Sequence, residues 1–199
     1  MRSALGIDFN LRLGRGFKTD VDKLVALVRS SMNFRPHQRM PAAQLAKKLK
    51  MSIRTPHDIT DIPEEHLQEL IVHGKNRWSA VLLKAEQPHN HLIINNPTHS
   101  EQRKESNVFH EISHELCEHD PDDVEIIGGL PVRRYCPEKE LQAETLGFTL
   151  HLPKDCLFWA AKNQMNRTDI SDYFCASSEL VRFRINATGI ERILKKRIP

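Results

Sequence analysis

Two histidines and a glutamate at a fixed spacing form the most informative pattern in this chain. The segment His110-Glu111-Ile112-Ser113-His114 has the form H-E-x-x-H. On a helix, residues four apart share one face, so both imidazoles can reach a single metal ion. The glutamate between them then lies beside that ion, where it can act as general base on a water molecule. The pattern predicts a hydrolytic metal site with Glu111 as the base.

Apolar residues around the motif favour a helix. Phe109, Ile112 and Leu116 recur at i, i+3 and i+7, which gives one apolar stripe for burial. Ser106 or Asn107 is expected to cap the start of this helix. The histidines then occupy the face beside the buried stripe. The alternative is that they are half-buried core side chains with no metal.

A catalytic zinc site needs a third protein ligand, which must come from elsewhere in the chain. A second helix is predicted from Pro137, because proline suits the first helical position and acidic residues suit the first turn. Glu140 and Glu144 are four apart and share a face of this helix. Spacing alone leaves either one as the third ligand, and without the histidine motif both would fit a solvated acidic face equally well.

The chain resembles the ImmA/IrrE-type zinc metallopeptidases. The resemblance rests on the H-E-x-x-H phrase with Phe109 before it, on His119, and on a second helix that ends in a proline. Residues 140–153 are similar to the family phrase E-x-x-A-N-x-F-A-x-x-L-L-M-P, with Glu144 where the family usually has a small polar residue. The resemblance implies an α+β, zincin-like minimal metallopeptidase, with a small twisted sheet packed on the motif helix and the second ligand helix and with extra N- and C-terminal helices.

The resemblance also implies a ligand set. Carried over by position, His110, His114 and Glu140 hold one Zn²⁺ ion, which Mn²⁺ can replace, and Glu111 is the catalytic base. We expect three further residues to lie behind the ligands, that is, to contact the ligand side chains and not the metal: His119, Glu144 and Cys117. Like-charge repulsion from Glu144 is expected to raise the pKa of its neighbour, and Glu144 competes for the metal.

Elements before the motif fit the same family order. Residues 41–49 predict a short helix, and residues 78–83 and 91–95 predict two strands. We expect the edge strand that pairs with an extended substrate to be Leu92, Ile93, Ile94 and Asn95. The expected division is an N-terminal extension and helix (1–40), a metallopeptidase core (41–153) and a C-terminal helical subdomain (154–199).

Composition bounds the class of protein. The chain has 199 residues, 39% of them apolar, and a formal net charge of +3, which is too small to argue for nucleic acid. Its four cysteines show no C-x-x-C pairing, and most are expected to be buried apolar residues. No segment is apolar enough to span a bilayer and no signal peptide is evident, so we expect a cytoplasmic protein with no membrane association.

The end of the chain is basic, with two short helices predicted around residues 170–181 and Ser177 or Ser178 as a cap. A DNA-binding helix-turn-helix is one interpretation. We favour a helical pair packed on the core, with no DNA binding. Residues 119–129 are acidic and end in two glycines, which predicts an exposed loop.

The function that we expect is endopeptidase cleavage of a separate partner. By resemblance, that partner is a helix-turn-helix transcriptional repressor or an antitoxin-like protein. His151 and Tyr135 are the candidates for the donor that stabilises the oxyanion. The alternative is a metal-binding module that regulates or binds DNA or a partner without routine proteolysis, although an intact Glu111 argues against it.

Overall fold

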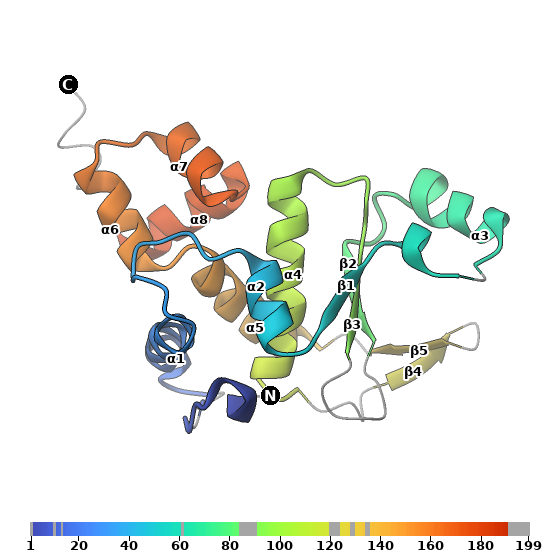
Figure 1. The fold of residues 1–199 in the computed structure, drawn as a ribbon, viewed down its shortest axis with the longest axis horizontal. Helices are drawn as coiled ribbons and strands as arrows, with labels where there is room; N and C mark the ends of the chain where they lie inside the picture. Colours follow the sequence, from blue (N-terminus) through green and yellow to red (C-terminus); the bar gives the residue numbers. More distant parts are fainter. Residues whose placement is uncertain are drawn as a thin grey trace.

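The computed structural model describes residues 2–9, 11–12, 14–60, 62–83, 91–119, 124–127, 130–133 and 136–190. The α-helices are α1 (Phe17–Ser31), α2 (Ala42–Lys48), α3 (Glu64–Gln68), α4 (Glu101–Leu116), α5 (Pro137–His151), α6 (Lys154–Lys162), α7 (Arg167–Phe174) and α8 (Ser178–Thr188). The strands are β1 (Ser52–Arg54), β2 (Ala80–Leu83), β3 (Leu92–Asn95), β4 (Val124–Ile127) and β5 (Leu130–Arg133). The predicted α+β class is confirmed, with a small sheet beside α4 and helices on its other side (Figure 1).

Three short strands form a sheet in which β3 is central. β1 lies parallel to β3 with Ile53 opposite Ile93, and β2 lies antiparallel to it with Leu82 opposite Ile93. The prediction that residues 92–95 form an edge strand is wrong, because both sides of β3 are paired. Ile93 and Asn95 are buried and alternate with half-buried neighbours, a pattern that an edge strand and a central strand share.

Helix α4 lies between the three-stranded sheet and the C-terminal helices α6, α7 and α8, whereas α3 lies on the far side of the sheet (Figure 1). It begins after Ser100, whose hydroxyl accepts a hydrogen bond from the backbone N–H of Arg103 at 3.3 Å. The expected cap at Ser106 or Asn107 is wrong, because both residues lie inside the helix. These first turns are polar and line a cleft, so the apolar periodicity of the buried stripe begins only at Val108.

Helices α4 and α5 form the most extensive contact between any two elements described. Leu146 and Leu150 of α5 are fully buried, as are Phe109 and Ile112 of α4. Gly147 allows the two backbones to meet. A Cβ at this position would lie 3.2 Å from the Phe109 carbonyl oxygen and 3.2 Å from backbone atoms of the next residue along α4.

Two apolar clusters fill the interior. The larger cluster joins α1, α2, β3, α4 and α5, and it includes Leu24 and Leu150. The smaller cluster belongs to the C-terminal helices, with Leu152, Leu157, Ala160, Ile170, Phe174, Val181 and Ile185 among its members. Helix α1 therefore shares its core with the motif helix. The division at residues 40/41 and 153/154 stays a prediction.

The segment after α4 and the C-terminal segment both form regular secondary structure. The acidic segment after α4 was expected to be a loop, but residues 124–127 and 130–133 pair as an antiparallel hairpin, β4–β5. The glycines at 128 and 129 lie outside the described residues. The predicted C-terminal helices are α7 and α8, and Ser177 caps α8 by accepting a hydrogen bond from the Leu180 N–H at 3.1 Å.

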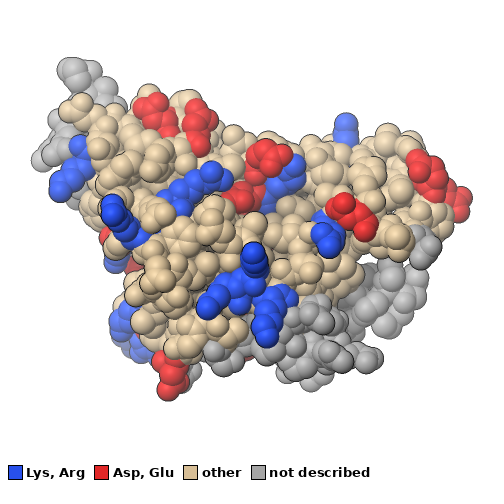
Figure 2. Space-filling model, in the orientation of Figure 1, with Lys and Arg blue, Asp and Glu red and all other residues tan. Residues whose placement is uncertain are grey.

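The surface carries both signs of charge. Basic and acidic side chains are interspersed over the upper part of the face in Figure 2, in keeping with the small net charge. Among the described residues, no helix combines the length and the apolar composition that crossing a bilayer would require.

Candidate metal centre

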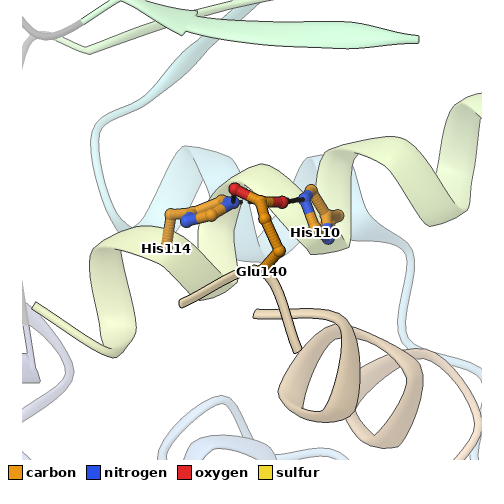
Figure 3. A group of neighbouring side chains, drawn as sticks. All are labelled: His110, His114 and Glu140. Carbon is orange, nitrogen blue, oxygen red and sulfur yellow. Dashed lines mark hydrogen bonds and ion pairs between the residues drawn. The ribbon is translucent and has the colours of Figure 1, made fainter. Parts of the chain in front are cut away.

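Three side chains from two helices converge on one point (Figure 3). His110 and His114 project from α4, and Glu140 projects from the first turn of α5. The two histidine Nε2 atoms are 3.1 Å apart. Glu140 Oε2 lies 3.2 Å from His110 Nε2, and Glu140 Oε1 lies 3.5 Å from His114 Nε2. One ligand atom from each residue lies within 4.8 Å of the other two, so the group can surround a single ion.

The donor set and its spacing fit zinc. A tetrahedral zinc ion with bonds of about 2.0–2.1 Å places its ligand atoms roughly 3.3–3.4 Å apart, against the 3.1, 3.2 and 3.5 Å observed. Two imidazoles and one carboxylate are a donor set of catalytic zinc sites, which keep a fourth position open. The side chains of His110 and Glu140 are 29% and 28% exposed, so the cluster has an accessible side.

The register of α5 separates the two candidate glutamates. Glu140 contacts both histidines, whereas Glu144 is exposed one turn later and lines the neighbouring cleft. The sequence spacing left this choice open, because either carboxylate lies at a suitable distance along the chain. The geometry supports Glu140, the residue that the family resemblance implies.

The cluster attracts positive charge. Burial lowers the pKa of His110, but its hydrogen bond to Glu140 and the charges of Glu111, Glu140 and Glu144 outweigh burial and leave this pKa raised. The hydrogen bonds from His110 and His114 hold the pKa of Glu140 well below its ordinary value, although burial opposes them. A bound divalent cation would balance the negative charge of these carboxylates in place of a proton on His110.

A chain of hydrogen bonds connects His114 to α5. His114 Nδ1 lies 2.9 Å from His119 Nδ1, and His119 Nε2 lies 2.9 Å from Gln142 Oε1. An amide oxygen only accepts, so His119 donates from Nε2 and its Nδ1 accepts from the Nδ1–H of His114. With a metal ion bound, this arrangement would leave the unprotonated Nε2 of His114 facing the ion. The sequence placed His119 behind the ligands, but no pattern pointed to Gln142.

Two further candidates lie on the motif helix or directly after it. Glu111 is 9% exposed between the histidines, and its charge raises the pKa of His110. Cys117 was expected behind the ligands. It is the C-cap residue of α4 and is buried in the main apolar core, where it is 2% exposed; its role behind the ligands stays a prediction.

Neither candidate for the oxyanion donor can be assigned. Tyr135 lies outside the described residues. His151 is buried, with Nδ1 3.1 Å from Ser106 Oγ and Nε2 3.2 Å from the Phe174 carbonyl oxygen. Both of its ring nitrogens are engaged away from the metal cluster, so the expectation for His151 is wrong.

A comparison with known protein families identifies the family to which this chain belongs. Residues 71–186 match Peptidase_M78, the IrrE N-terminal-like domain. The match covers more than half of the chain and contains α4, α5 and the three residues of the cluster. The chain belongs to this family. No curated protein and no solved structure matched the chain. As a Peptidase_M78 member, the chain has a metallopeptidase fold, and the His-His-Glu cluster is its candidate metal site.

A cleft of about 1450 Å³ opens beside the cluster of this Peptidase_M78 domain. One wall is α4 with Ser79, the second is α5, and the third is α8. The lining residues are Ser79, Ser100, Arg103, Ser106, Asn107, His110, Pro137, Glu140, Leu141, Glu144, Phe148, Ser177, Glu179, Leu180, Arg182, Phe183 and Asn186. The family match ends at residue 186, within α8, so it contains all three walls. The sequence did not predict the third one.

Proposed function

We propose that this chain is a zinc-dependent endopeptidase that cleaves a separate protein. The observation that carries the proposal is the convergence of His110, His114 and Glu140 beside a cleft large enough to admit a peptide segment. Membership of Peptidase_M78 supports peptide hydrolysis as the reaction. Zinc in particular is supported by the donor set and by the spacing of the ligand atoms.

In this proposal, different residues of the chain have different roles in hydrolysis. Zinc, when bound, supplies a Lewis acid that makes a water molecule more acidic and polarises the substrate carbonyl. Glu111 accepts the proton of the attacking water and delivers it to the leaving nitrogen. His119 and Gln142 hold the His114 ring in one tautomer and one orientation, so the ligand is set before the substrate binds.

We propose β2, in place of β3, as the strand that pairs with the substrate. β2 lies at one edge of the described sheet, and Ser79, just before it, lines the cleft. This start of the strand is fixed to α4, because Asn107 Nδ2 donates to the Ser79 carbonyl oxygen and Arg103 Nη2 donates to Ser79 Oγ, both at 3.1 Å. Main-chain pairing along β2 would direct an extended peptide into the cleft.

The partner that we propose is a helix-turn-helix transcriptional repressor or an antitoxin-like protein encoded separately. This part of the proposal comes from the resemblance to ImmA/IrrE-type proteins. A partner of this kind acts in the cytoplasm, which is also the location that we propose for the peptidase.

The test compares the wild type with Glu111→Gln on a candidate repressor from a neighbouring gene. Both proteins should bind one zinc ion, measured by mass spectrometry of metal content. The variant should cleave at least about 100-fold more slowly, because general-base catalysis contributes roughly 10²–10⁴. Glu101→Gln, an exposed change at the start of the same helix, is the matched control and should cleave normally.

A different outcome would favour the regulatory alternative. If zinc-loaded wild type leaves its partner intact, and Glu111→Gln still controls that partner in cells, the chain acts by binding and the endopeptidase proposal is wrong.

A further inference from the structure

Large apolar side chains are exposed on the cleft wall that α5 and α8 share. Leu141 is 62% exposed and Phe183 is 46% exposed. The Phe148 and Phe183 rings meet edge to face, with centroids 5.2 Å apart and an interplanar angle of 67°. All three side chains line the same cleft as His110 and Glu140. Apolar surface that stays in contact with water costs free energy, so a cluster of it beside the metal centre indicates a binding role.

The position of Phe183 is fixed by its neighbours on α8. Arg184, 7% exposed, donates from Nε to the Leu152 carbonyl oxygen at 2.9 Å, which ties α8 to the end of α5. Leu180 and Ile185 are buried in the C-terminal cluster. The aromatic wall is therefore formed before any ligand arrives, which lowers the entropy lost on binding.

We propose that Leu141, Phe148 and Phe183 form an apolar subsite that selects peptides with a large apolar side chain next to the scissile bond. This inference rests on the proposed endopeptidase function and specifies its substrate class. Leu141 directly follows the ligand Glu140, so the subsite begins beside the metal position. Phe148 lies two helical turns further along α5, so the subsite extends outward from the metal position. In an extended peptide each residue advances about 3.3 Å, so the side chain that contacts Leu141 belongs to a residue adjoining the cleaved bond.

The occupant is one side chain of an extended peptide. A docked helix has a diameter of about 10–12 Å and keeps its carbonyls within its own hydrogen bonds, so it does not offer a carbonyl to attack at the metal. An extended peptide paired with β2 offers its backbone to the metal centre. Its side chains alternate between two directions, and one of these directions faces the subsite.

Hydroxamates test the subsite without the natural substrate, because they bind through the metal. N-acetyl-leucine hydroxamate is compared with N-acetyl-glycine hydroxamate on zinc-loaded protein, by calorimetry. Isobutylsuccinyl and succinyl hydroxamates form a second pair, which places the same side chain on the other side of the metal. Burial of an isobutyl group should make the branched member of one pair bind at least about tenfold more tightly.

Variants assign that preference to the subsite. Phe183→Ala and Leu141→Ala should each bring the ratio close to one, whereas Phe183→Leu should keep most of it. Tyr173→Ala is the matched control, since Tyr173 is 47% exposed on α7 and is not a lining residue of the cleft. Zinc content and melting temperature are measured for every variant, and the exposed position of Leu141 keeps that variant foldable.

Two results overturn the subsite. One is equal binding of the branched and unbranched members in both pairs. The other is a preference that survives both Phe183→Ala and Leu141→Ala. If the unbranched hydroxamates do not bind the zinc-loaded protein at all, the proposed metal site is wrong, and the subsite proposal falls with it.

Discussion

Gly147 of α5 lies directly against the backbone of His110 on α4. A Cβ added at Gly147 would lie 3.2 Å from both the N and the Cα atoms of His110, closer than ordinary van der Waals contact. The absence of a side chain at one position of α5 therefore sets how closely Glu140 can approach the two histidines.

Gly147→Ala should reduce the free energy of zinc binding by more than it reduces the free energy of unfolding. Alanine gains about 1 kcal/mol of helix propensity, while overpacking between fixed backbones costs roughly 1–3 kcal/mol. The net loss of stability should therefore be about 0–2 kcal/mol, and Gly147→Val should lose more. Urea unfolding and competitive zinc titration measure the two effects. Gly14→Ala is the control, because the added Cβ meets nothing within 4 Å, and it should change neither stability nor zinc affinity. Normal zinc affinity in Gly147→Val would show that the contact between Gly147 and His110 does not position the ligands.

The two glutamates of α5 should behave differently when neutralised. Glu140→Gln removes a charged ligand. It should lower zinc affinity by more than roughly 100-fold, which is the largest loss typical of residues that only hydrogen-bond to a ligand. Glu144→Gln, an exposed change, should lower it less than tenfold. Isothermal titration with zinc compares them, and a larger loss for Glu144→Gln would move the third ligand by one helical turn.

The hydrogen-bond chain behind His114 should affect metal binding without contacting the metal. His119→Ala and Gln142→Leu each remove a partner that orients the His114 ring, so each should lower zinc affinity about 10–100-fold. Nitrogen-15 NMR of the imidazoles should show that His114 loses its single tautomer in both variants. Gln44→Ala, exposed on α2, is the control. Unchanged zinc affinity in Gln142→Leu would mean that the chain is only structural.

Buried His151 should make the fold sensitive to mild acid. Burial lowers its pKa to about 4, against the ordinary 6.5, despite hydrogen bonds to backbone that favour the proton; the charge of Arg39 lowers the pKa further. Between pH 6.5 and 4 the unfolded chain binds a proton that the folded chain excludes, so stability falls as pH decreases through this range. The loss reaches up to about 3 kcal/mol.

Chemical denaturation of zinc-free protein at several pH values measures this effect. His151→Met replaces the ring with an apolar side chain of similar size and should have a flatter profile than the wild type between pH 6.5 and 4. Parallel profiles for the two proteins would assign the acid sensitivity to other histidines.

Removal of metal should destabilise the fold, because the proposed zinc ion would bind only the folded cluster and would join α4 to α5. At a free zinc concentration 100 times the dissociation constant, binding contributes about 2.7 kcal/mol. A chelator should therefore lower the melting temperature of the wild type by several degrees. The melting temperature of Glu140→Gln at the same zinc concentration should change little, and an equal decrease in both proteins would place the stabilising ion elsewhere.

The local features of the site were readable from sequence because they depend on residues a few positions apart. The H-E-x-x-H spacing, the proline that opens α5 and the cap at Ser177 each act within one or two helical turns. Glu140 could not be chosen over Glu144 by spacing, because the choice depends on how α5 is rotated against α4.

The features that sequence missed depend on distant partners. β3 is central because three residues, Ser52–Arg54, add a parallel strand, and so short a segment carries no periodic signal. The first turns of α4 are polar because they face the cleft. They therefore lack the apolar periodicity that would have indicated where the helix begins. No sequence pattern pointed to Phe183, because its exposure follows from the way α8 packs against α5.

The residues of the candidate metal centre and the wall formed by α8 lie on separate stretches of the chain. His110, Glu111, His114 and Glu140 belong to α4 and α5, whereas the exposed positions of α8 begin nearly forty residues later, at Ser178. Substitutions at the exposed positions of α8 can therefore accumulate without altering the proposed catalytic residues. In a lineage of such proteins, the choice of target can diverge while the reaction stays the same.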